Sequence, residues 1–167
     1  MTCQQTLLNP LTLIENLGMR FLVFDAPSTN TLPLYLKEFQ KHGVTDVVRV
    51  CEPTYPREFL EKNGIKVHEM SYGDGEAPPR NVVNEWLELI QARFLDNTGP
   101  KPTIGVHCVA GLGRAPVLVA IGLIEQGMSP LDSVMFIRER RRGAINNKQI
   151  KYIEAYKRQK GGKCSIC

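Results

Sequence analysis

The sequence predicts an α/β protein with a central, mostly parallel, twisted sheet flanked by helices. Short β-branched runs at residues 45–51 and 103–106 are typical of buried strands. Segments with apolar residues at helical spacing, such as residues 80–95, alternate with these runs. This alternation indicates parallel strands joined by helices, with ligands bound at the carboxyl ends of the strands. The 167 residues are enough for one domain with a substantial core.

The chain is expected to begin with two paired strands and then to alternate. Leu17 and Gly18 separate the first two strands, and Gly43 and Gly64 end two helices. Ser129 supplies an N-cap before a proline at the first helical position. The expected strands are residues 11–16, 19–24, 45–51, 65–70 and 103–106, and the expected helices are residues 32–41, 56–63, 80–95, 115–126, 130–141 and 147–158.

Composition limits the class of protein. The net charge is +4, and the hydrophobic content is 43%. No apolar run reaches the length of a membrane span, and the N-terminus lacks a secretory signal pattern. The five cysteines are irregularly spaced, which fits reduced thiols in the cytosol better than a disulfide framework. Basic residues are frequent in the last thirty positions, so the sequence predicts either an anionic partner there or a solvated helix face.

Residues 107–114, His-Cys-Val-Ala-Gly-Leu-Gly-Arg, lie between an expected strand and an expected helix. Gly111 and Gly113 permit the backbone to turn its N–H groups inward, and the helix directs its positive end at the same point. Arg114 adds a planar set of donors suited to phosphate oxygens. The residues expected to bind the phosphate are Val109, Ala110, Gly111, Leu112, Gly113 and Arg114.

The thiol of Cys108 lies at the start of this loop. The same dipoles favour its thiolate, which is a nucleophile for phosphoryl transfer. A buried core cysteine is the commonest alternative for a free Cys. The two glycines, the preceding strand and the following helix together favour the catalytic interpretation.

The Cys-x5-Arg pattern is the signature loop of the protein tyrosine phosphatase superfamily. Residues 106–120 resemble one branch of it, the phosphatases of regenerating liver (PRL), and similar segments occur in PRL order over residues 19–157. The resemblance implies the protein tyrosine phosphatase-like fold. It also implies that Cys108 attacks phosphorus and Arg114 binds phosphate oxygens, with no metal or organic cofactor.

A phosphatase also needs an acid that protonates the leaving oxygen. Residues 73–79, Gly-Asp-Gly-Glu-Ala-Pro-Pro, form a loop with glycine hinges, which by itself is more often a polar surface turn. The PRL resemblance instead implies that Asp74 is the general acid. The chain departs from the PRL pattern at Gly73, which replaces an aspartate, and at the additional Glu76, which is the alternative acid.

Three further residues take expected roles from the resemblance. His107 is expected to support the loop by hydrogen bonding. Cys51, at the end of an expected strand, is implied to form a reversible disulfide with Cys108, although a cysteine there is more often part of the core. Ala115 stands where most relatives carry a hydroxyl that bonds the departing thiolate, so slow turnover and a long-lived phosphocysteine are expected.

The chain divides into an expected phosphatase domain, residues 1–158, and a basic tail, residues 159–167. The tail ends Cys-Ser-Ile-Cys, a Cys-a-a-X pattern that predicts prenylation of Cys164 and attachment to an anionic membrane surface. The expected location is the cytoplasmic face of plasma or endosomal membranes, with a cytosolic pool of unprenylated chain. A redox or metal-binding Cys-x-x-Cys and a disordered tail are the alternatives.

The expected activity is slow hydrolysis of phosphate monoesters through a phosphocysteine. The substrate is a phosphorylated protein, carrying phosphotyrosine or phosphoserine/threonine, or a phosphoinositide; no nucleic-acid partner is expected. The resemblance also implies a second class of function, a weakly catalytic module that docks onto CNNM-type magnesium transporters. A rhodanese-like sulfur transferase is a third alternative, disfavoured by the arginine and the acid loop.

Overall fold

A computed structural model of the chain describes residues 6–159. Its centre is a five-stranded sheet in the order β1-β2-β5-β3-β4. The strands are β1 (Thr12–Asn16), β2 (Met19–Phe24), β3 (Val44–Arg49), β4 (Lys66–Glu69) and β5 (Thr103–His107). β1 and β2 pair antiparallel, and all other pairs are parallel. The mostly parallel α/β fold predicted from the sequence is therefore confirmed.

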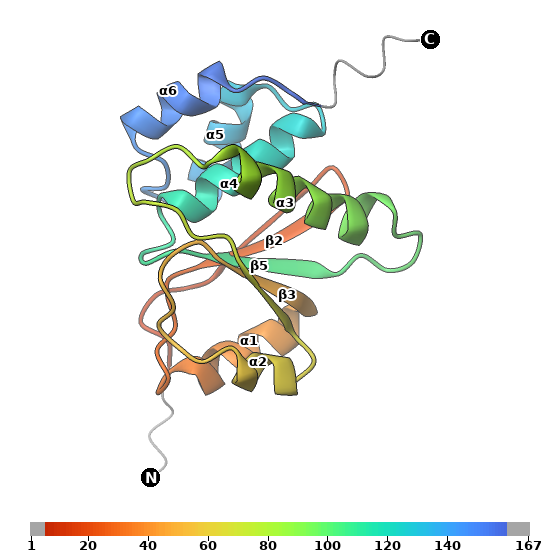
Figure 1. Ribbon diagram of the computed structural model, residues 1–167, viewed down its shortest axis with the longest axis vertical. Coiled ribbons are helices and arrows are strands. Elements are labelled where there is room, and N and C mark those ends of the chain that lie inside the picture. The colour runs from red at the N-terminus through yellow and green to blue at the C-terminus, as the bar shows by residue number, and fades with distance from the viewer. Residues whose placement is uncertain (1–5, 160–167) are drawn as a thin grey trace.

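Helices cover both faces of the sheet (Figure 1). α1 (Leu32–His42) and α2 (Glu58–Lys62) lie on one face. The other face carries α3 (Arg80–Ile90), α4 (Arg114–Glu125), α5 (Pro130–Arg140) and α6 (Asn147–Ala155). Within residues 6–159, no helix has both the length and the apolar character needed to cross a membrane.

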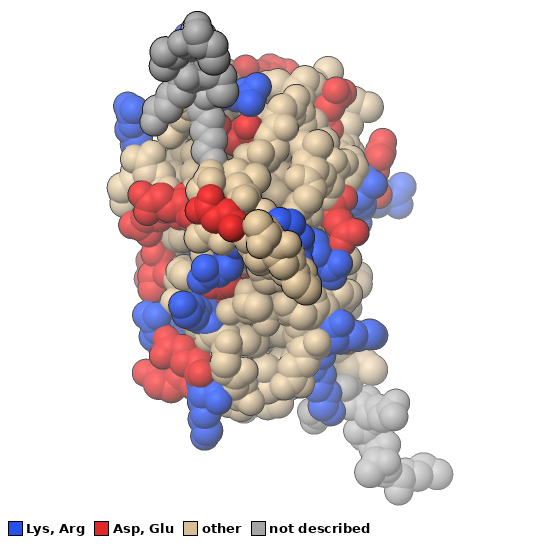
Figure 2. All heavy atoms as spheres, turned by 90° about the vertical axis from the view of Figure 1, so that its right-hand side faces the viewer, with Lys and Arg blue, Asp and Glu red and all other residues tan. Residues whose placement is uncertain are grey.

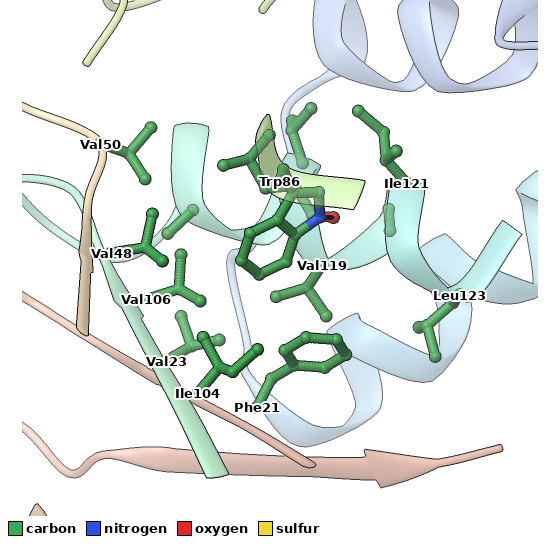
Figure 3. Close-up of a cluster of buried hydrophobic side chains, with 14 of the residues drawn as sticks. Phe21, Val23, Val48, Val50, Trp86, Ile104, Val106, Val119, Ile121 and Leu123 are labelled. Carbon is green, nitrogen blue, oxygen red and sulfur yellow. Dashed lines mark hydrogen bonds between the residues drawn. The ribbon is translucent and has the colours of Figure 1, made fainter. Parts of the chain in front are cut away.

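Each face of the sheet has its own core because side chains alternate along a strand. On β2, Phe21 and Val23 point into the larger core, whereas Leu22 and Phe24 point into the smaller one. In the larger core Trp86 packs on Phe21, with ring centroids 5.4 Å apart, and its indole N–H donates to the Leu118 carbonyl at 2.6 Å (Figure 3). α4 is buried along its whole length, which fixes the start of this helix beside the end of β5.

Several element boundaries differ from the sequence predictions. β3 ends at Arg49, so Cys51 lies two residues beyond the strand that it was expected to end. The long helix expected over residues 80–95 is α-helical only to Ile90 and continues as a π-helical turn, η1 (Gln91–Leu95). In that turn the Arg93 guanidinium is drawn to Asp46, with hydrogen bonds of 2.8 and 3.0 Å.

The last helix is shorter than predicted. α6 ends at Ala155 rather than at Arg158, and Tyr156 is extended. The reason is Glu125 at the end of α4: its carboxylate accepts from the Tyr156 hydroxyl at 2.7 Å and from the Gln159 N–H at 2.8 Å. These bonds hold residues 156–159 against the end of α4, and this segment is not helical.

Candidate active site

Cys108 follows β5, the middle strand of the sheet, and α4 begins six residues later at Arg114. The Cys108 side chain is buried in the same core cluster as the first turn of α4. Within residues 6–159 no side chain caps the start of α4, so the N–H groups of Arg114 and Ala115 are not taken up by a capping side chain. A helix N-terminus of this kind attracts anions.

The carbonyl oxygens of residues 109–112 are all bound from outside the loop. The donors are the backbone N–H groups of Ala26 and Ile145 and the guanidinium of Arg141. The distances are 2.9 Å from Ala26 N to Val109 O, 3.3 Å from Arg141 Nη2 to Ala110 O, 2.7 Å from Arg141 Nε to Gly111 O, and 2.7 Å from Ile145 N to Leu112 O.

This arrangement determines where the loop N–H groups point. The described chain contains no cis peptide bond, and in a trans peptide the C=O and the next N–H point in opposite directions. Because the carbonyls of residues 109–112 are held outward, the N–H groups of residues 110–113 face the interior of the loop. Gly111 makes the turn possible with φ +70°, and a Cβ atom there would lie 2.6 Å from the Phe24 carbonyl oxygen.

Arg114 is positioned by Tyr72 from the loop after β4. Its Nη1 donates to the Tyr72 carbonyl at 2.9 Å, and the Tyr72 hydroxyl donates to the Arg114 carbonyl at 3.2 Å. The Nε of Arg114 is the one buried side-chain N or O atom in residues 6–159 without a hydrogen-bond partner. An unsatisfied buried donor is costly, so this atom is suited to donate to an anionic ligand held by the loop.

His107 is fully buried behind the nucleophile. Its Nδ1 lies 3.2 Å from the Cys108 carbonyl, which can only accept, so Nδ1 carries the proton. Nε2 therefore accepts from the Tyr55 hydroxyl at 2.8 Å. Burial lowers the pKa of His107 to about 4, which keeps the imidazole neutral at physiological pH. Tyr55 is held in turn by Arg49, whose Nη1 donates to its carbonyl at 2.5 Å.

Cys51 lies behind the same histidine. Its Sγ is 3.9 Å from His107 Nδ1, and both Cys51 and Cys108 are buried free thiols. Burial raises the pKa of Cys51, and the nearby Cys108 raises it further, against the opposing effect of Arg114. The two cysteines expected to pair are thus within electrostatic reach of each other.

Asp74 extends from the loop between β4 and α3. Its side chain is 84% exposed, and one carboxylate oxygen, Oδ1, lies 3.9 Å from Arg114 Nε. Asp74 is thus the carboxylate that faces the unsatisfied donor of the phosphate loop.

Comparison with known proteins gives the family. A sequence model described as "Tc-R-P: Polymorphic toxin system, DSP-PTPase phosphatase" matches residues 24–128. The chain is 53% identical over 158 residues to "Probable protein tyrosine phosphatase type IVA A" of Dictyostelium discoideum, covering 95% of this chain and 94% of the relative. It is 48% identical to the "PRL-1 phosphatase" of Drosophila melanogaster, covering 93% and 88%. This chain belongs to the PRL family of protein tyrosine phosphatases.

A solved structure agrees with this assignment. "Protein Tyrosine Phosphatase (putative) from Leishmania major" matches with a TM-score of 0.81 and 46% identity, covering 89% of this chain and 99% of that chain. The family resemblance and the phosphatase-like fold expected from the sequence are confirmed, and the chain is a Cys-dependent phosphatase of phosphorylated substrates.

Two departures from the PRL pattern occupy the same space in the acid loop. A Cβ atom added to Gly73 would lie 2.6 Å from the Cδ and Oε2 atoms of Glu76. The Glu76 side chain therefore covers the position that a side chain at residue 73 would fill. The Glu76 N–H also donates to the Gly73 carbonyl at 3.1 Å, which closes a turn around Asp74. The exchange at residue 73 and the additional glutamate are thus structurally coupled.

Sequence reasoning missed three residues of the site. Tyr55 and Tyr72 lie in loops without a motif, so only the fold reveals them. Arg141 was counted within a basic run whose predicted role was an anionic partner or a solvated face. That prediction was wrong for Arg141, which is buried against the phosphate loop. Arg138 is exposed, as a solvated face requires, although it also donates to the Ala144 carbonyl at 3.0 Å.

Proposed function

We propose that this PRL-family chain dephosphorylates phosphorylated proteins and that Cys108 carries the reaction. The observation that supports this most directly is the loop of outward-bonded carbonyls around Cys108, closed by the unsatisfied Nε of Arg114. The inward N–H groups of the loop, together with Arg114 Nε and Nη2, suit the nonbridging oxygens of one phosphoryl group. The proposed hydrolysis needs neither a metal nor an organic cofactor.

The reaction takes two steps. The Cys108 thiolate attacks phosphorus and the ester P–O bond breaks, while Asp74 donates its proton to the leaving oxygen. Water then attacks the phosphocysteine, the Asp74 carboxylate takes the proton of that water, and the P–S bond breaks to restore the thiolate. His107, held neutral by burial, acts through the Cys108 carbonyl and not as an acid or base.

The mouth of the loop favours a phosphoprotein over a lipid headgroup. Val109 is 62% exposed and Leu112 is 37% exposed, so two apolar side chains of the phosphate loop face outward. The carboxylate of Asp74 is exposed beside it, 3.9 Å from Arg114 Nε, and the carboxylate of Glu76 is exposed in the same short loop. An aromatic ring packs on such a rim, whereas a headgroup with additional phosphates would be repelled by the two carboxylates.

The test is a panel of substrates at equal concentration. Phosphotyrosine peptides should be turned over faster than phosphoserine or phosphothreonine peptides and faster than phosphoinositides in micelles. Cys108→Ser should abolish turnover of every substrate, because a hydroxyl is a far weaker nucleophile at neutral pH. Turnover that survives in Cys108→Ser, or a preference for phosphoinositides, would contradict the proposal.

Slow hydrolysis of the phosphocysteine follows from Ala115. This residue is fully buried at the second position of α4, in the same core cluster as Cys108. A serine hydroxyl there would bond the departing thiolate, and such a bond to a charged group is worth about 1.5–3 kcal/mol. Ala115→Ser is therefore expected to raise steady-state turnover by about 10- to 100-fold and to shrink the pre-steady-state burst. Stopped-flow measurement with an activated aryl phosphate checks this, and a wild-type trace without a burst would exclude it.

We further propose that Cys51 and Cys108 form a reversible disulfide. Both thiols are buried, and the Cys51 Sγ lies 3.9 Å from Nδ1 of His107, the residue that directly precedes Cys108, which supports this pairing. Mild peroxide should give a Cys51–Cys108 disulfide that a thiol reductant reopens with recovery of activity. In Cys51→Ser the same treatment should carry Cys108 to irreversible oxidation. Peptide mapping by mass spectrometry distinguishes these products, and sulfonic acid at Cys108 beside a reduced Cys51 in the wild type would exclude the disulfide.

Membrane attachment stays a prediction. Cys164, the predicted prenylation site, lies outside the described residues, as do most of residues 159–167. Mass spectrometry of the chain from a eukaryotic host, compared with Cys164→Ser, tests the modification and the predicted membrane location. Docking onto a CNNM-type magnesium transporter is likewise a prediction that a binding assay with Cys108→Asp would test.

A further inference from the structure

Residues 9–12, here called the N-terminal segment, lie against the rear of the phosphate loop. They precede and begin β1, at the edge of the sheet. Their link to the loop is Arg141, which follows α5 and is buried. The guanidinium donates to both: Nε and Nη2 bond the loop carbonyls of Gly111 and Ala110, while Nη1 bonds the Pro10 carbonyl at 3.1 Å and the Thr12 hydroxyl at 2.9 Å.

The guanidinium fills the space between the segment and the loop. A Cβ atom on Gly111 would lie 2.6 Å from Arg141 Nη2, so the two groups are in direct contact. Nη1 also donates to the Val23 carbonyl at 3.3 Å, which anchors it to β2. The guanidinium is planar, with its five N–H donors in a fixed arrangement. A displacement of Nη1 on the segment side therefore also displaces Nε and Nη2 on the loop side.

The charge of Arg141 is directed at neutral oxygens. Among residues 6–159 no carboxylate lies within ion-pair distance of it. Burial lowers the pKa of Arg141, while Asp25 and Cys108 raise it by smaller effects. This positive group therefore stands behind the phosphate loop within electrostatic reach of the nucleophile.

A second contact joins the same segment to the start of the loop. Asn9 donates to the Asp25 carboxylate at 2.9 Å, and the Tyr35 hydroxyl donates to the other oxygen of that carboxylate. Asp25 directly precedes Ala26, whose N–H donates to the Val109 carbonyl at 2.9 Å. The N-terminal segment thus bonds Arg141, which holds two loop carbonyls outward, and Asp25, the neighbour of the residue that holds a third.

We infer that Thr12 is a positioning residue for the phosphatase reaction, and that it acts through Arg141 on the phosphate loop. The inference rests on the proposed role of Cys108. The Thr12 hydroxyl is the closest of the three acceptors of Nη1, at 2.9 Å against 3.1 Å for the Pro10 carbonyl and 3.3 Å for the Val23 carbonyl. Its loss leaves Nη1 on the two longer bonds, so the guanidinium shifts and the carbonyls of Ala110 and Gly111 are held less firmly. The next N–H groups lose their inward orientation, which weakens their hold on the thiolate and on phosphate.

The experiment compares Thr12→Val, which keeps the side-chain shape, with Thr12→Ser, which keeps the hydroxyl. Two quantities are measured: the pH profile of Cys108 alkylation by iodoacetamide, followed on the Cys108 peptide by mass spectrometry, and the rate of the pre-steady-state burst with an aryl phosphate. For Thr12→Val the profile should move to higher pH and the burst should slow by about fivefold. Thr12→Ser should stay within about twofold of wild type.

A double-mutant cycle decides whether Thr12 acts through Arg141. In an Arg141→Met background, Thr12→Val should change neither the alkylation profile nor the burst further. The inference is overturned if Thr12→Val leaves the profile unchanged while lowering only the thermal midpoint, or if its effect persists undiminished in Arg141→Met. The alkylation profile does not depend on turnover, so it tests the role of Thr12 even if the proposed phosphatase activity fails. Failure of the proposed activity itself would be revealed by Cys108→Ser.

Discussion

Arg114→Lys is expected to lower kcat/KM for an aryl phosphate by about a thousandfold, although it preserves the charge. The reason is geometric. Arg114 uses Nη1 to bond the Tyr72 carbonyl at 2.9 Å, which leaves Nε buried and unsatisfied toward the loop. Only a planar guanidinium can hold that anchor and still offer two parallel donors to phosphate. A lysine ammonium must choose between the Tyr72 carbonyl and the substrate.

Tyr72→Phe is the matched control for this prediction. It removes the hydroxyl that donates to the Arg114 carbonyl at 3.2 Å but keeps the backbone carbonyl that anchors Nη1. Its kcat/KM should stay within about threefold of wild type. Phosphate or vanadate inhibition, measured in parallel, should weaken in Arg114→Lys and not in Tyr72→Phe. Equal kcat/KM for Arg114→Lys and wild type would show that charge alone suffices and that the unsatisfied Nε has no role.

The nucleophile was predictable because its chemistry is local in the sequence. Cys108 and Arg114 are six positions apart, and the two glycines between them together with the flanking strand and helix define a loop around one anion. The groups that shape this loop are distant in sequence. Arg141 contacts Gly111 across thirty positions and Val23 across more than a hundred. Such contacts depend on the packing of α5 against β1, which periodicity does not specify.

Charge was the least informative part of the sequence reading. A run of arginines was read by its net charge, whereas the structure uses Arg138 and Arg141 as hydrogen-bond donors to backbone carbonyls. On the face seen in Figure 2, basic and acidic side chains are interspersed. A local excess of basic residues therefore predicts a solvated face or an anionic partner only when the buried members of the run are excluded first.

The sheet end remote from the phosphate loop holds a buried carboxylate that we expect to stabilise the fold. Asp46 on β3 is fully buried and accepts from Arg93, His68 and Thr45 at 2.6 to 3.0 Å. Burial acts to raise the pKa of Asp46, but the hydrogen bonds outweigh it and hold the pKa well below its usual range. Asp46→Asn should therefore lower the free energy of unfolding by about 3 kcal/mol at pH 7, because the Arg93 guanidinium loses its counter-charge.

The contribution of Asp46 to the free energy of unfolding is expected to decrease as the pH falls. A carboxyl group whose pKa is depressed in the folded state stabilises the fold above its unfolded pKa of about 3.9, and the contribution is lost as pH falls toward the folded value. The stability difference between wild type and Asp46→Asn in urea unfolding should thus shrink from pH 7 to pH 3. Arg93→Met in the Asp46→Asn background should recover part of the loss, since it removes the unpaired cation. A difference that stays constant over this pH range would mean that Asp46 contributes by packing and not by charge.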